Sequence, residues 1–170
     1  MSRIVAFVAI ACACAATATA APAPRVGAAG VTVALPAGWH SWVPATVDPT
    51  YPDPLTRVVA VSAPFTLAPT NCQVGAYAFP ATAVAIVVLE WVPMKGLPRP
   101  SSFRARPASF DAKALAVHPG PAIECFKGPG GATNFEERGR AFGAYLMVGP
   151  KASATAVARA RAVLDSLRVS

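Results

Sequence analysis

The stretch Ala83–Trp91 (AVAIVVLEW) constrains the fold more than any other part of the chain. It is apolar apart from Glu90, rich in valine, and bounded by Pro80 and Pro93. A short run of β-branched residues between such breakers favours a strand with both faces buried over a helix. We therefore expect a sheet with this strand near its centre.

Further strands are predicted where β-branched or alternating residues end at proline or glycine. These segments are Val31–Leu35, Arg57–Ala63 and Ala141–Val148. The glycine-rich stretch Gly128–Gly131 predicts a hairpin loop between strands over 122–127 and 132–137, and Gly139 a second turn. Cys72–Phe79 is interpreted as a short helical turn before Pro80.

The C-terminal segment has a different periodicity. From Ser153 onward, apolar residues recur every three or four positions, as on one face of an amphipathic helix: Val157, Ala160, Val163, Leu164 and Leu167. Ser153 is the expected N-cap. The predicted fold class is therefore α+β, a mostly antiparallel sheet with a packed C-terminal helix, in a single domain over residues 31–170.

The N-terminus has the pattern of a secretory signal peptide over residues 1–20. Arg3 precedes an apolar run, Ile4–Ala16, and an Ala-x-Ala site, Ala18-Thr19-Ala20, with cleavage expected after Ala18 or Ala20. The run is shorter than the roughly 20 residues that a membrane-spanning helix needs, and no later segment is long enough to span. We expect a secreted or extracellular envelope-associated protein whose residues 21–30, rich in Pro, Ala and Gly, form a flexible lead-in. The alternative is a lipoprotein anchored at Cys12.

Removal of the signal peptide leaves two cysteines, Cys72 and Cys125. An even pair in an exported chain predicts one disulfide. The bridge closes a loop of about 53 residues, which the chain-entropy model values at about 4 kcal/mol. The alternative is a pair of buried thiols that act as small hydrophobic side chains.

The chain is cationic. Its net charge is +7, and removing Arg3 with the signal peptide leaves 14 basic and eight acidic residues, a net charge of +6. An exported protein of this charge is suited to an anionic envelope polymer or membrane surface. A basic segment with one aromatic residue contains Arg99, Phe103, Arg104 and Arg106, and we interpret it as a candidate partner-binding loop. Nucleic acid is not an expected partner, because basic and aromatic residues alternate too rarely.

Catalytic and metal-binding motifs are absent from the sequence. There is no Gly-x-Ser-x-Gly, and the histidines, His40 and His118, each stand alone. Glu90 lies at the end of the most apolar strand, where we expect an ion pair with Arg140 or Arg99. We assign no catalytic residue, no metal site and no cofactor.

Several short motifs together resemble uncharacterised exported proteins of high-GC Gram-positive bacteria. They are Leu35–Trp39, Arg57–Phe65, Val88–Trp91, Pro98–Phe103, Glu124–Cys125, Gly139–Phe142 and Val163–Val169. The strand followed by Pro-Ala-Gly-Trp and the terminal helix ending in Asp-Ser-Leu are also similar to the PsbP-like fold, an antiparallel sheet sandwiched by helices. Members of that fold mostly act as extrinsic subunits or binding proteins, so the resemblance implies a binding role.

The sequence thus predicts an exported, non-enzymatic domain that binds a partner protein or an anionic cell-envelope component. A small secreted hydrolase with an unrecognised site is the alternative. An open cleft in which Glu90, a histidine and a serine converge would favour the hydrolase.

Overall fold

The structure is a computed structural model that describes residues 22–42, 55–68, 76–78, 80–92, 103–123, 126 and 128–170. The predicted signal peptide, Cys12, Arg99 and both Cys72 and Cys125 lie outside the described residues. In chain order the elements are β1 (Arg25–Ala28), β2 (Val31–Ala34), β3 (His40–Ser41), β4 (Leu55–Val61), β5 (Thr66–Ala68), β6 (Ala76–Ala78), β7 (Val84–Trp91), β8 (Arg104–Ala105), β9 (Gly130–Glu137), β10 (Arg140–Val148), α1 (Ala154–Asp165) and β11 (Arg168–Val169).

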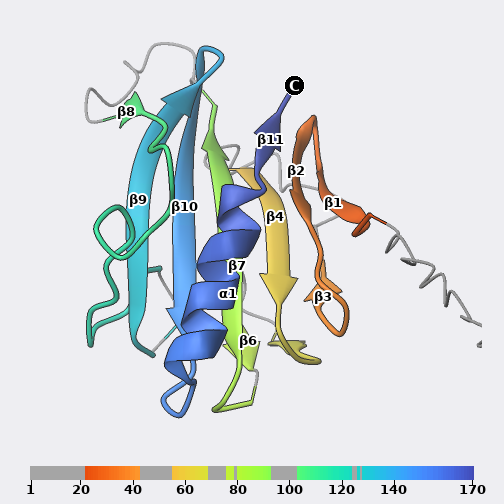
Figure 1. The fold of residues 1–170 in the computed structure, drawn as a ribbon, viewed down its shortest axis with the longest axis vertical. Helices are drawn as coiled ribbons and strands as arrows, with labels where there is room; N and C mark the ends of the chain where they lie inside the picture. The colour runs from red at the N-terminus through yellow and green to blue at the C-terminus, as the bar shows by residue number, and fades with distance from the viewer. Residues whose placement is uncertain are drawn as a thin grey trace, which may run out of the picture.

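The main sheet has six strands in the order β3-β4-β7-β10-β9-β8. All its pairings are antiparallel except that of β8 with β9. β7 lies between β4 and β10, and its residues from Val84 to Val88 are fully buried. The predicted central strand is confirmed, as is the α+β class with a mostly antiparallel sheet (Figure 1).

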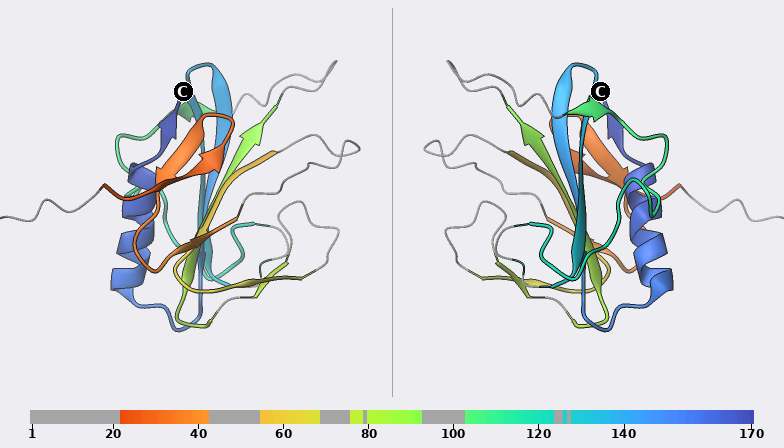
Figure 2. Two further views of the ribbon diagram at one scale, coloured as in Figure 1. Left: turned by 90° about the vertical axis from the view of Figure 1, so that its right-hand side faces the viewer. Right: turned by 90° about the vertical axis from the view of Figure 1, so that its left-hand side faces the viewer.

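Helix α1 covers one face of this sheet (Figures 1 and 2). The Ser153 hydroxyl accepts a hydrogen bond from the Ala156 amide at 3.1 Å, which confirms the predicted N-cap. The helix buries Ala160, Val163 and Leu164 in one cluster with alternate residues of β4, β7, β10 and β9. The three-and-four periodicity of the C-terminal segment therefore identifies the face that the sheet covers.

Residues 25–28 differ from the predicted flexible lead-in. They form β1, which pairs with β2 and, with β11 on the other side of β2, makes a three-stranded sheet. The Arg25 guanidinium donates to the Thr32 carbonyl at 2.8 Å and to the Ser166 carbonyl at 2.7 Å, just past the end of α1. The N-terminal strand is thus held by its hairpin with β2 and by the distant Ser166 carbonyl, neither of which its Pro, Ala and Gly composition indicates.

Two predicted turns are also corrected. Gly130 and Gly131 begin β9, so the predicted hairpin loop over 128–131 is wrong; the hairpin in this region joins β9 and β10 through Arg138 and Gly139. A Cβ added at Gly131 would collide with the Ala116 carbonyl oxygen, so the glycines allow a covering loop to approach the strand. In the segment predicted to be a helical turn, residues 76–78 form strand β6.

The opposite face of the main sheet carries a second apolar cluster. Its sheet residues, buried on β4, β7 and β10, are Val59, Val61, Ala85, Val87, Leu89 and Met147. Ile123 and the partly buried rings of Trp42, Phe65 and Phe126 pack against them. Both faces of β7 are therefore covered, as its continuous apolar sequence requires. Among the described residues, no helix combines the length and hydrophobicity that crossing a membrane demands.

Candidate functional site

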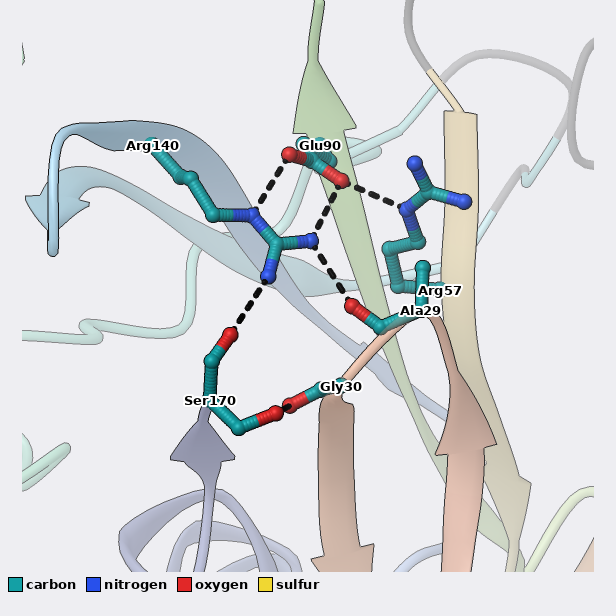
Figure 3. A network of polar contacts seen from close by, with 6 residues as sticks. All are labelled: Ala29, Gly30, Arg57, Glu90, Arg140 and Ser170. Atoms are coloured by element: carbon teal, nitrogen blue, oxygen red, sulfur yellow. Dashed lines mark hydrogen bonds and ion pairs between the residues drawn. The ribbon is translucent and has the colours of Figure 1, made fainter.

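A network of polar contacts lies at one end of the main sheet, around Glu90 (Figure 3). Glu90 is the seventh residue of β7, directly opposite Phe142 of β10 and Leu55 of β4. Arg140 donates from Nε to Glu90 Oε1 at 2.8 Å and from Nη2 to Oε2 at 2.8 Å. Arg57 donates from Nε to Oε2 at 2.6 Å. The carboxylate therefore accepts a forked pair of bonds from one guanidinium and a third bond from another.

The electrostatics of this cluster follow from those bonds. The hydrogen bonds from Arg140, opposed by burial and aided by Arg57, lower the pKa of Glu90 from its ordinary value of 4.5. The same contact raises the pKa of Arg140. Glu90 is thus held ionised at neutral pH and satisfied by arginines, which suits a structural ion pair rather than a proton donor.

The predicted strand-end pair of Glu90 with Arg140 is confirmed. Arg57 was missed because it lies 33 residues from Glu90 along the chain, and only the pairing of β4 with β7 brings it close. Arg140 also donates to the Ala29 carbonyl at 3.0 Å and to the Ser170 carbonyl at 3.3 Å. One side chain therefore joins the main sheet to the β1–β2 turn and to the residue after β11.

In the predicted partner-binding segment, some residues make contacts within the fold and others are exposed to solvent. Phe103 packs edge-on against Trp91, with ring centroids 6.3 Å apart. Arg106 donates to Glu137 Oε2 at 3.1 Å and to the Leu167 and Asp165 carbonyls at 3.0 and 3.3 Å. The Asp165 carbonyl ends α1 and the Leu167 carbonyl lies two residues beyond it, at the helix end where the dipole favours a cation.

Of the candidate residues Phe103, Arg104 and Arg106 in the described part of that segment, Arg104 is the exposed one. Phe103 and Arg106 both make contacts within the fold.

Arginines gather at the end of the sheet that holds Glu90, which we call the arginine end. It comprises Arg57, Arg104, Arg106, Arg138, Arg140 and Arg168. Figure 1 shows that β8, the β9–β10 turn and β11 reach the same end of the molecule. Arg104 of β8, Arg138 of the turn and Arg168 of β11 are exposed there. None of these three forms an ion pair with a carboxylate of the described residues.

Acidic side chains of the described region are mostly bound within the fold. Besides Glu90, Glu137 pairs with Arg106 at 3.1 Å, and Asp165 accepts a hydrogen bond from the Phe110 amide at 2.6 Å. Asp111 accepts from the Lys113 and Ala114 amides at 2.8 and 2.9 Å, and these bonds lower its pKa. None of these four carboxylates forms an ion pair with Arg104, Arg138 or Arg168.

The histidines lie elsewhere in the fold. His40 is exposed on β3 opposite Val61, and His118 is exposed and exchanges backbone hydrogen bonds with Gly130. Neither contributes to the contacts of Glu90, whose described partners are Arg57 and Arg140. Within the described ranges, no three His, Cys, Asp or Glu side chains come close enough to hold a metal ion.

Comparison with known proteins adds no relative: no family model, no curated protein and no solved structure matches the chain.

Proposed function

We propose that the chain is an exported, non-enzymatic domain that binds an anionic component of the cell envelope through its arginine end. The observation that supports this is the set of guanidinium groups of Arg104, Arg138 and Arg168 at one end of the sheet, which are exposed and form no ion pair with another described residue. An oxyanion can accept two parallel hydrogen bonds from each such group. We favour an anionic component over a partner protein because the cluster is cationic.

Ion pairs at the arginine end hold the elements that carry the exposed arginines in place. Arg140 and Arg57 bind Glu90, and Arg106 binds Glu137 and the carbonyls at the C-terminal end of α1. The strands and turn that carry the exposed arginines are thereby tied to the main sheet. Prearranged cations lose less freedom on binding than cations on loose segments do.

Export and the finer fold assignment belong to the same proposal. A mature N-terminus at Thr19 or Ala21 would support free secretion, and an acylated Cys12 would support a lipoprotein. We also propose that the fold is a PsbP-like sandwich, on the basis of the sequence motifs and of the antiparallel sheet with its C-terminal helix.

A vesicle-sedimentation experiment tests the proposed binding. The mature protein should bind vesicles of phosphatidylcholine mixed with phosphatidylglycerol and should not bind phosphatidylcholine alone. The triple variant R104S/R138S/R168S should lose about 3 kcal/mol of binding, or about a hundredfold in affinity, at about 1 kcal/mol per cation. The control K113S/K151S/R159S removes three exposed cations elsewhere and should bind more tightly than the first triple variant.

Added salt should weaken the wild-type interaction, because the Debye length falls from about 8 Å at physiological ionic strength to about 3 Å at 1 M. Wild-type protein that ignores anionic vesicles and soluble anionic polymers alike would refute the proposal. Turnover of an ester, peptide or glycan substrate that is abolished by one substitution would support the hydrolase instead.

A further inference from the structure

Two residues other than glycine adopt left-handed backbone angles in the described part of the chain, and each opens a two-residue hairpin turn. Ala29, with φ 50°, precedes Gly30 between β1 and β2, and Arg138, with φ 53°, precedes Gly139 between β9 and β10. Positive φ at both turn positions is the pattern of a type I′ turn, in which Asn, Asp or Gly is preferred at the first position. Neither alanine nor arginine suits that position, since a Cβ without a local hydrogen bond is disfavoured there.

The two turns differ in what holds them. The Ala29 carbonyl accepts a hydrogen bond from Arg140 at 3.0 Å, so the turn is tied to the ion-pair cluster. The Arg138 side chain is exposed and forms no hydrogen bond or ion pair with another described residue. Its turn projects at the arginine end beyond the neighbouring strand ends (Figures 1 and 2). An arginine thus occupies a position where a smaller residue would suit the fold better, and nothing described within the fold uses its charge.

Backbone strain that the fold itself does not require tends to occur at functional positions. We propose that Arg138 contributes more to binding than the other arginines of the arginine end and that it binds phosphate groups of the envelope component. This inference rests on the function proposed above and assigns its ligand chemistry and its central residue. A guanidinium suits phosphate because its planar fork donates two parallel hydrogen bonds, whereas a lysine ammonium acts as a point charge.

Four single variants of the mature protein separate charge from turn strain. R138N removes the cation and places a preferred residue in the turn, and R138K keeps the charge but removes the fork. A29N relieves the same kind of strain at the same end without changing charge. R159Q removes an exposed cation from α1 and leaves both turns unchanged.

Each variant is measured by thermal unfolding and by sedimentation with vesicles of phosphatidylcholine and phosphatidylglycerol. R138N should weaken binding about fivefold and yet raise the melting temperature by roughly 2–4 °C. A29N should raise the melting temperature similarly and bind as the wild type does. R138K should bind with an affinity between those of the wild type and R138N, and R159Q should lose less affinity than R138N.

The outcomes test the role of Arg138 separately from the proposed binding function. Wild-type binding that R138N leaves unchanged, or that R159Q weakens equally, would overturn the role of Arg138 and leave the proposed function standing. Wild-type protein that binds no anionic probe would refute the function itself. Displacement by soluble poly(glycerol phosphate) would assign the phosphate to a polymer, and resistance to it would assign the phosphate to the lipid surface. Equal displacement by polyglutamate would overturn the phosphate assignment.

Discussion

Replacing Glu90 with glutamine should destabilise the fold strongly while preserving the shape of the side chain. In the native protein one carboxylate neutralises two guanidinium groups, those of Arg57 and Arg140, at 2.6–2.8 Å. A neutral amide leaves both cations close together and only partly solvated, because their side chains are 17% and 23% exposed. It also weakens the attachment of Arg140, which holds the β1–β2 turn and the carbonyl after β11.

The magnitude follows from burial. Removing one partner of a buried ion pair costs about 3–5 kcal/mol, because an uncompensated charge remains. The Glu90 side chain is 10% exposed, but its partners reach solvent, so we expect a loss near the lower end, about 3 kcal/mol. A domain of this size has a free energy of unfolding of about 5–15 kcal/mol, so the loss is a large share of it.

Urea unfolding monitored by tryptophan fluorescence measures this loss. With a slope of about 2 kcal/mol per molar urea, the midpoint of E90Q should fall by roughly 1.5 M. The matched control is E137Q, which breaks the pair with Arg106, where the two side chains are 22% and 25% exposed. The Glu137 carboxylate is more exposed than that of Glu90, so we expect E137Q to lower the free energy of unfolding by only about 1 kcal/mol.

The pH dependence gives a second readout. The pKa of Glu90 is lower in the folded protein than its ordinary value of 4.5. The ionised cluster therefore contributes stability that is fully present above about pH 4.5 and is lost as pH falls through the folded pKa. E90Q should lack this component, whereas the contribution of Asp111, whose pKa is also lowered, should persist. Equal losses in E90Q and E137Q, with unchanged acid dependence, would show that our assignment of the buried cluster is wrong.

Three further changes test other parts of the structure. S153A removes the N-cap hydrogen bond of α1 and should cost about 1 kcal/mol, read as a fall of roughly 2–4 °C in melting temperature; S153N should restore most of it. G131A forces a Cβ against the Ala116 carbonyl oxygen and should cost at least about 2 kcal/mol in urea unfolding, and a loss below about 0.5 kcal/mol would contradict that contact. Cys72 and Cys125, which lie outside the described residues, should resist alkylation under non-reducing conditions, and two reactive thiols in natively exported protein would exclude the disulfide.

The sequence alone was enough to predict elements that are specified by residues close together in the chain. β7 was predictable because an uninterrupted valine-rich run can be satisfied only where both faces of a strand are covered. Helix α1 and its Ser153 cap were predictable because the apolar period and the capping side chain lie within a few residues of each other. The turn at Gly139 was predictable because glycine tolerates the positive φ of 72° that this turn requires.

Tertiary structure decided the rest, because the deciding contacts join residues far apart in sequence. The Arg25 guanidinium donates to the Ser166 carbonyl, 141 residues away, in a segment that its composition predicted to be a flexible lead-in. The glycine-rich composition of residues 128–131 predicted a loop. The structure instead shows that Gly131 lies in a strand and that the Ala116 backbone packs against it. The sequence alone does not show which arginines form ion pairs and which are exposed, because that depends on how the strands pair. The fold brings Arg57 and Arg140 to Glu90 and Arg106 to the C-terminal end of α1. It leaves Arg104, Arg138 and Arg168 exposed to solvent.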